Sequence, residues 1–201
     1  MQNNEMQKNE MQEQQETESP AVDFSAEFDA LINANGKITP ALLMAVNRYF
    51  LYFTFFESLL LGCAGSQGKS LKYAVKLLEL KMVDLDILKL TYQFFADRYL
   101  ADSIKFDSLC GDLLHTKQKA KDIKIAAMNS RSDDPEVQLD VCIFVCFRLR
   151  NNLFHGPKWR YLLEGQEELL LTAGDLIHSI LEKAPRGKEG WVFQDILSST
   201  E

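Results

Sequence analysis

The stretch from Leu139 to Phe147 constrains the fold more than any other part of this sequence. Its nine residues carry one charge, at Asp140, and are otherwise apolar. Such a segment is typical of a helix buried in a protein core. The rest of the chain shows helical periodicity but no convincing run of alternating strand residues. We therefore predict an all-α protein, most simply an up-and-down bundle of four or five helices.

Composition divides the chain into four parts. Residues 1–20 repeat the letters NEMQ and contain no aromatic residue, so we expect a disordered, low-complexity tail. Residues 21–38 are expected to form an N-terminal helical extension and residues 39–185 the bundle. Residues 186–201 are expected to be a C-terminal tail. A chain of 201 residues with 46% hydrophobic and 25% charged residues has enough apolar material for one core.

Apolar periodicity and helix-start signals place the helices of the bundle. We expect helices over 39–61, 71–99 (one long or two short), 106–129, 137–155 and 166–183. Thr39-Pro40 and Asp134-Pro135 read as helix starts. Six aromatic residues fall between Tyr49 and Phe56, too many for one core-facing stripe. A second side of that helix is therefore available to another subunit.

Charge and apolar runs exclude several classes of protein. A net charge of −7 gives no overall basic signature of a nucleic-acid binder, although a local basic patch is still compatible with it. The polar, acidic N-terminus is not a secretory signal. The longest apolar run is interrupted at Glu57 and Ser58 and is shorter than the roughly 20 residues of a membrane span. We expect a cytoplasmic protein with no membrane association.

The cysteines and a glycine-rich loop carry no strong functional signal. None of the four cysteines forms a CxxC pair, so we expect them to be small buried hydrophobes in a reducing compartment. The loop GCAGSQGKS resembles a phosphate-binding P-loop, but the spacing fails because Cys63 stands where the first glycine is required. No cluster of carboxylates, cysteines and histidines suggests a metal, and no cofactor is expected.

The polar end of the apolar helix is the best candidate for a functional site. Five polar side chains follow Phe147 within eight positions: Arg148, Arg150, Asn151, Asn152 and His155. Arginine offers a permanently charged fork for phosphate oxygens, and histidine moves protons near neutral pH. This set suits metal-independent RNA cleavage, in which the 2'-hydroxyl attacks the adjacent phosphorus to leave a 2',3'-cyclic phosphate and a 5'-hydroxyl. The alternative is structural, with solvated arginines and His155 capping the helix.

The segment RNNLFHG, from Arg150 to Gly156, resembles the Arg-x4-His motif of the HEPN superfamily. RYFLYFTFFESLL (48–60) and GDLIHSILE (174–182) are similar to the first and last helices of one small bacterial group within it. The resemblance implies an all-helical ribonuclease with Arg150, Asn151 and His155 as catalytic residues. It also implies toxin or phage-defence biology, with an antitoxin protein as a further partner. Arg148, Asn152 and Lys158 are our candidate RNA contacts.

Helix geometry raises one difficulty for this site. At about 100° per residue, one helix face holds Arg148, Asn151, Asn152 and His155, whereas Arg150 points nearly the opposite way. A distorted helix, a long side chain that wraps round, or a neighbouring subunit would each solve this. HEPN ribonucleases usually build a composite site across a homodimer, so the resemblance implies that arrangement here.

A few residues outside this helix are weaker candidates for function. A string of lysines at positions 117, 119, 121 and 124, preceded by His115, either steers RNA or is simply a solvated helix face. Glu57 is expected to be partly buried and is a candidate partner for an arginine near the site. His178 is expected to be an ordinary residue of the last helix. Two alternatives to a ribonuclease stay open: a catalytically silent HEPN module that binds nucleic acid, nucleotide or protein, and an unrelated helical adaptor.

Overall fold

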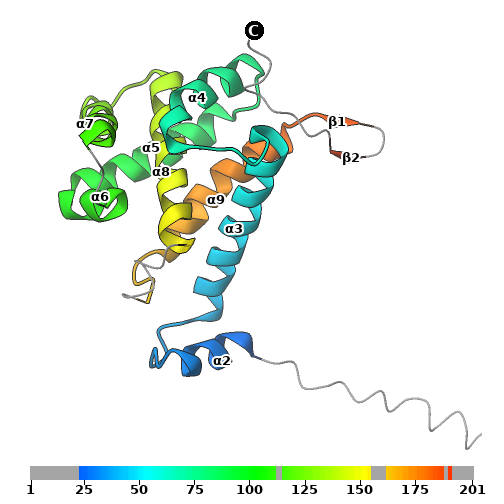
Figure 1. Cartoon of the computed structure of the whole chain (residues 1–201), viewed down its shortest axis with the longest axis vertical. Helices are drawn as coiled ribbons and strands as arrows, with labels where there is room; N and C mark the ends of the chain where they lie inside the picture. Colours follow the sequence, from blue (N-terminus) through cyan, green and yellow to red (C-terminus); the bar gives the residue numbers. More distant parts are fainter. Residues whose placement is uncertain (1–22, 112–114, 155–161, 188–189, 192–201) are drawn as a thin grey trace, which may run out of the picture. The chain divides into compact units, whose positions relative to one another are not determined.

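A computed structural model describes residues 23–111, 115–154, 162–187 and 190–191, and most of them are helical (Figure 1). The strands within these ranges are a two-residue antiparallel pair, β1 (Arg186–Gly187) and β2 (Gly190–Trp191). The all-α prediction is therefore confirmed. The tail predicted over residues 1–20 lies outside the described residues. The chain forms two compact units that meet in sequence at Thr39 and Pro40.

The first unit is one short helix and the turn after it. Helix α2 (Phe24–Leu31) begins at Asp23, whose carboxylate accepts hydrogen bonds from the backbone N–H groups of Ser25 and Ala26. This satisfies donors that have no acceptor within the helix. The Asp29 carboxylate then accepts from the N–H groups of Gly36, at 2.8 Å, and Ile38, at 2.9 Å. The turn is thus held against the helix that precedes it.

The second unit is a helical bundle. Its helices are α3 (Pro40–Leu61), the short 3-10 helix η1 (Gln67–Lys69), α4 (Ser70–Glu79), α5 (Leu85–Leu100), α6 (Ser103–Cys110), α7 (His115–Asn129), α8 (Pro135–Phe154) and α9 (Glu167–Glu182). Helix α8 packs against α3 through α7 and against α9. Every residue from Leu139 to Phe147 is buried, none more than 7% exposed. The burial predicted for this segment is confirmed.

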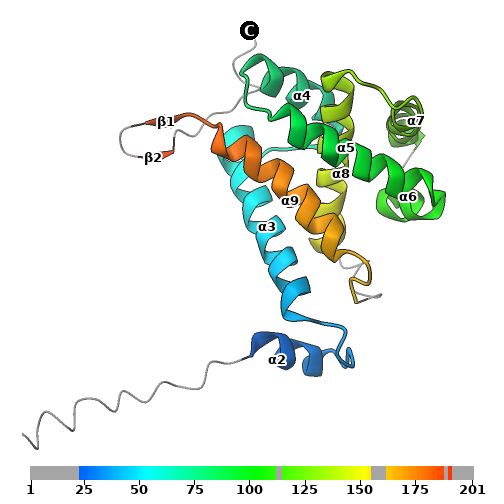
Figure 2. The ribbon, with the colours of Figure 1, turned by 180° about the vertical axis from the view of Figure 1, so that it is seen from behind.

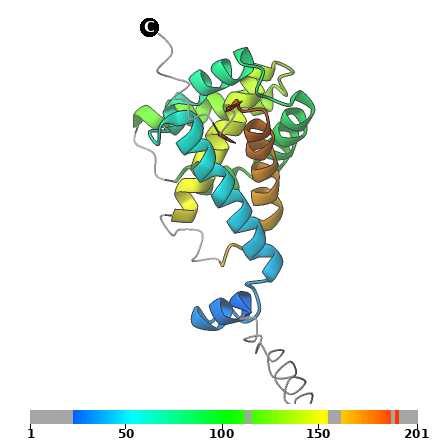
Figure 3. The same cartoon turned by 90° about the vertical axis from the view of Figure 1, so that its right-hand side faces the viewer.

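Helices α3 and α9 form the most extensive pair and run side by side in all three overall views (Figures 1 to 3). Gly174 of α9 lies against the backbone of Tyr49, since a Cβ there would come within 3.7 Å of the Tyr49 Cα. The Tyr49 hydroxyl donates a 2.5 Å hydrogen bond to the Cys146 carbonyl of α8. Three of the six aromatics of α3 are buried, Tyr49, Phe53 and Phe56, as one core-facing stripe allows.

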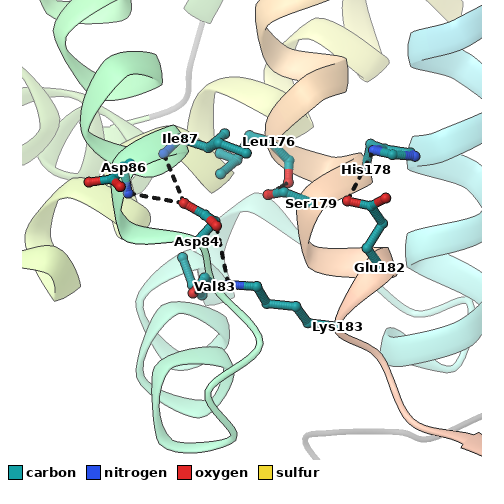
Figure 4. A network of polar contacts seen from close by, with 9 residues as sticks. All are labelled: Val83, Asp84, Asp86, Ile87, Leu176, His178, Ser179, Glu182 and Lys183. Atoms are coloured by element: carbon teal, nitrogen blue, oxygen red, sulfur yellow. Dashed lines mark hydrogen bonds and ion pairs between the residues drawn. The ribbon is translucent and has the colours of Figure 1, made fainter.

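Two predicted helices are each divided in two. The segment predicted over 71–99 forms α4 and α5, the second of the two possibilities. Asp84 caps α5 by accepting from the N–H groups of Asp86 and Ile87, and Lys183 at the end of α9 donates to the Val83 carbonyl (Figure 4). The single helix predicted over 106–129 is wrong. Helix α6 ends at Gly111, whose φ of 63° is accessible to glycine at little cost.

A buried ion pair joins three helices of the bundle. Lys124 of α7 and Asp140 of α8 form a salt bridge, and the Ser70 hydroxyl at the start of α4 donates to the same carboxylate at 2.6 Å. All three residues are buried. Asp140, the single charge of the apolar segment, therefore has its two partners inside the core, as a buried carboxylate requires.

Three of the four cysteines, Cys110, Cys142 and Cys146, are buried as predicted. The prediction is wrong for Cys63, which is exposed in the loop after α3. Gly62 and Cys63 both adopt positive φ there, which ends the helix. Burial raises the pKa of Cys110 to about 11 and that of Cys146 to about 12, so both are neutral thiols.

No described helix combines the length and the apolar character needed to cross a membrane.

Candidate functional site

A pocket of about 480 Å³ lies beside the C-terminal half of α8. One wall is a single face of that helix, because Phe144, Phe147, Arg148 and Asn151 follow the spacing i, i+3, i+4, i+7. The loop 65–68 and Ala120 of α7 form the other walls, and Arg150 completes the lining. The pocket thus brings together three of the predicted site residues, Arg148, Arg150 and Asn151.

Arg150 reaches the pocket through the length of its side chain. Helix α8 remains α-helical through Phe154, so no distortion within the described residues turns Arg150 toward this face. The guanidinium lies over two rings, with Cζ 5.7 Å from the ring centre of Phe53 and 5.9 Å from that of Phe147. Its Nη1 donates to Asn151 Oδ1 at 3.0 Å. Of the three solutions weighed from the sequence, the structure contains the wrapped side chain.

Glu57 of α3 fixes the other end of this guanidinium. Its Oε1 accepts from Arg150 Nη2 at 2.5 Å, and the side chains are 17% and 26% exposed respectively. The expectation that Glu57 is partly buried and paired with an arginine of the site is confirmed. A charge-assisted hydrogen bond in a partly dry position holds a side chain more firmly than an exposed pair does.

Gly65 is a part of this site that the sequence did not single out. A Cβ at this position would lie 2.9 Å from Glu57 Oε1 and 2.9 Å from Phe147 Cζ, closer than such contacts allow. The chain therefore passes directly over the Glu57–Arg150 pair at a point where a larger residue does not fit. The sequence offers one indication of this contact, a glycine in the loop that directly follows an aromatic helix.

Arg148 and Asn152 have a structural role that was not predicted. Arg148 Nε and Nη2 donate to the carbonyls of Leu109 and Cys110, at 3.0 and 2.6 Å. Asn152 Nδ2 donates to the same Leu109 carbonyl at 2.9 Å, and Asn152 is buried. Both side chains therefore satisfy the open C-terminal end of α6. That the two side chains contact RNA stays a prediction; Asn152 is buried, and Arg148 also lines the pocket.

Burial lowers the pKa of Arg148 from its usual value, and the nearby Cys110 thiol opposes that change. The guanidinium remains charged, because an arginine stays protonated at any pH at which proteins fold. Arg148 Nη1 also donates to Gln67 Oε1 at 3.2 Å. Arg148 thereby connects the loop 65–68 to α6 and fixes one wall of the pocket.

Other predicted residues lie away from this arrangement or outside the described residues. His155 and Lys158 belong to residues 155–161, which the structure does not describe. His178 stacks on Tyr52, with ring centres 4.9 Å apart, and its Nδ1 lies 3.6 Å from Glu182 Oε2 (Figure 4). It is thus a residue of the last helix, as expected, and it lines a different pocket, between α5 and α9.

The lysine string of α7 is neither a free solvated face nor a continuous basic strip. Lys124 is buried against Asp140, and Lys121 pairs with Asp107 of α6 at 2.6 Å. Lys119 is exposed. Two of the four charges are therefore already neutralised by carboxylates, which weakens any role of this string in attracting RNA.

Among residues 23–111, 115–154, 162–187 and 190–191, no group of three or more His, Cys, Asp and Glu is arranged to hold a metal ion. Comparisons with protein-family models, with curated proteins and with solved structures gave no match to this chain. Only the pocket residues and the motif from Arg150 to Gly156 therefore point to a function.

Proposed function

We propose that the protein is a metal-independent, HEPN-type endoribonuclease whose site is the pocket beside α8. One observation carries this proposal: Arg150, the first residue of the motif, is held in the pocket by Glu57 and Asn151 and rests on two aromatic rings. A guanidinium fixed at four sides is preorganised for a developing negative charge. An arginine that served only as a solvated helix-end charge would have no need of these contacts.

The chemistry follows from the donors that remain. A guanidinium has five N–H groups, and Glu57 and Asn151 use one each, so the terminal nitrogens of Arg150 retain donors for a phosphate oxygen. In the proposed reaction the RNA 2'-hydroxyl loses its proton to His155 and attacks the adjacent phosphorus. Arg150 stabilises the charge on the phosphoryl oxygens as the bond to the 5'-oxygen breaks, and His155 returns the proton to that departing oxygen. The products are a 2',3'-cyclic phosphate and a 5'-hydroxyl.

A second copy of the chain is the proposed partner in completing the site. Met44 and Leu51 lie on one face of α3 and are 64% and 61% exposed. Phe154, 56% exposed at the end of α8, packs edge-on to the ring of Phe50, 5.3 Å away. Exposed apolar side chains of this size are typical of interaction surfaces, and the patch adjoins the motif helix. Leu51→Glu is expected to convert a dimer to a monomer in size-exclusion chromatography with light scattering.

The proposed biological setting, a cytoplasmic toxin or phage-defence effector controlled by an antitoxin protein, rests on the HEPN resemblance alone. A neighbouring gene for such an antitoxin would support it.

Cleavage of generic single-stranded RNA in excess EDTA tests the activity. We expect cyclic-phosphate ends in the products of the unaltered chain and no such ends with Arg150→Ala or His155→Ala. Matched controls are Arg131→Ala, which removes an exposed arginine paired with Asp97, and His178→Ala. Absence of cleavage across varied RNAs by a folded dimer would favour the silent, binding form of the module instead.

A further inference from the structure

We propose a second, separate ligand site: the pocket between the end of α5 and the start of α9 binds a phosphate-type oxoanion. This pocket has a volume of about 290 Å³ and is lined by Arg98, Tyr99, Lys105 and the turn 163–166, together with Leu169. It shares no residue with the proposed ribonuclease site, and its test is independent of that function.

Two buried hydrogen-bond donors in this pocket wall have no acceptor. Neither Arg98 Nε nor the Tyr99 hydroxyl makes a hydrogen bond in the part of the chain that the structure describes. Tyr99 is only 4% exposed. Buried donors without acceptors are rare in folded proteins because each costs the free energy of its lost hydration. Here two of them stand side by side, so one ligand with several acceptor oxygens satisfies both.

The Tyr99 hydroxyl acts here as a donor. Burial raises its pKa far above the usual value, and the neighbouring Arg98 guanidinium offsets this only in part. The hydroxyl therefore keeps its proton and needs an acceptor rather than a cation. By contrast, the hydroxyl of Tyr92, which lies earlier in the same helix, donates to the Ala127 carbonyl at 2.7 Å.

The surrounding charges and dipoles favour an anion. Helix α9 begins in this pocket, and the side chain of its N-cap residue, Gln166, accepts no hydrogen bond from the first-turn N–H groups, which carry the positive end of the helix dipole. Arg98 and Lys105 add two positive charges. Lys105 Nζ is 3.6 Å from the Asp102 carboxylate, an exposed and weak pairing. Glu164 is the one acidic side chain of the lining and is exposed.

Binding requires a modest movement of one side chain. Arg98 Nη2 donates to the Gly165 carbonyl at 2.8 Å and so holds the turn in place. Arg98 Nε and the Tyr99 hydroxyl are buried in the ligand-free chain, so an oxoanion in the pocket cannot reach them directly. We therefore expect the Arg98 guanidinium to rotate toward the oxoanion when it binds. Phosphate suits the site better than a carboxylate because its tetrahedral oxygens serve donors that approach from several directions.

The test is calorimetric titration of the full chain with inorganic phosphate and, separately, with adenosine 5'-monophosphate, at constant ionic strength. We expect saturable binding that Tyr99→Phe and Arg98→Gln each weaken by about tenfold or more, since each removes a hydrogen bond to a charged acceptor. Tyr92→Phe is the matched control and should bind normally. Tighter binding of the nucleotide would identify a phosphomonoester ligand, and equal binding would identify free phosphate.

Stability measurements on the ligand-free variants test the premise itself. Tyr99→Phe removes a hydroxyl without an acceptor and should leave the unfolding midpoint unchanged or raised, whereas Tyr92→Phe should lower it. A drop in Tyr99→Phe equal to that in Tyr92→Phe would mean that the hydroxyl already has an acceptor, such as a water, and would overturn the proposal. Absence of binding, or binding that both pocket variants leave intact, would overturn it as well.

Discussion

Replacing Lys124 by methionine should destabilise the bundle far more than any other change in the lysine string. Methionine keeps the apolar stem of the side chain but leaves the Asp140 carboxylate in the core with Ser70 as its one remaining partner. Both charged side chains are nearly buried, at 7% and 11% exposure. Removing one member of a buried pair costs about 3–5 kcal/mol, because the other charge is left uncompensated.

Lys121→Met is the matched control in the same helix. Its partner Asp107 is 60% exposed, so water replaces the lost ammonium and the cost should stay below about 1 kcal/mol. The free energies of unfolding are measured by urea denaturation, followed by the helical circular dichroism signal. The double variant Lys124→Met with Asp140→Leu should recover most of the loss. Equal, small losses at positions 121 and 124 would refute the buried pair.

Three other predictions concern the Gly65 loop, Arg148 and the cysteines. Gly65→Ala should cost about 1–3 kcal/mol, because its Cβ meets Glu57 and Phe147 at 2.9 Å, whereas Gly68→Ala, with its nearest neighbour at 3.7 Å, should cost far less. Arg148→Met should lower stability by about 2–3 kcal/mol and raise hydrogen exchange at the end of α6, because two carbonyls lose their donor. A thiol reagent at neutral pH should modify Cys63 quickly and the three buried cysteines only after unfolding, and rapid labelling of all four would contradict the burial described here.

The sequence predicts the core of this fold well because buried helices require apolar residues at helical spacing, and this spacing can be read from the sequence. The apolar segment before Arg148 could only be a buried helix, and Asp134-Pro135 located its start. The division between α6 and α7 was missed because the apolar pattern continues across Gly111. Gly111 ends α6 with a positive φ, and only the tertiary contact with Arg148 shows that the carbonyls of Leu109 and Cys110 are satisfied there.

The site was partly predictable for similar reasons. Residue type and position on the helix face were enough to predict that Arg150 and Glu57 belong to the site. Their ion pair requires only that α3 and α8 lie close together. The role of Arg148 could not be inferred in this way, since the same charged side chain serves RNA or a helix end equally well until its partners are known. The position of Gly65 over the ion pair depends on loop geometry, which no local pattern encodes.

The rate of RNA cleavage in EDTA by Arg150→Ala, compared with Arg131→Ala, tests the central claim most directly. If the guanidinium fixed by Glu57 stabilises the charge that develops on the phosphoryl group, the first variant should lose activity by about 100-fold or more. The second should cleave at the rate of the unaltered chain, because Arg131 is exposed and does not line the pocket. Equal rates for the two folded variants would contradict the proposed site.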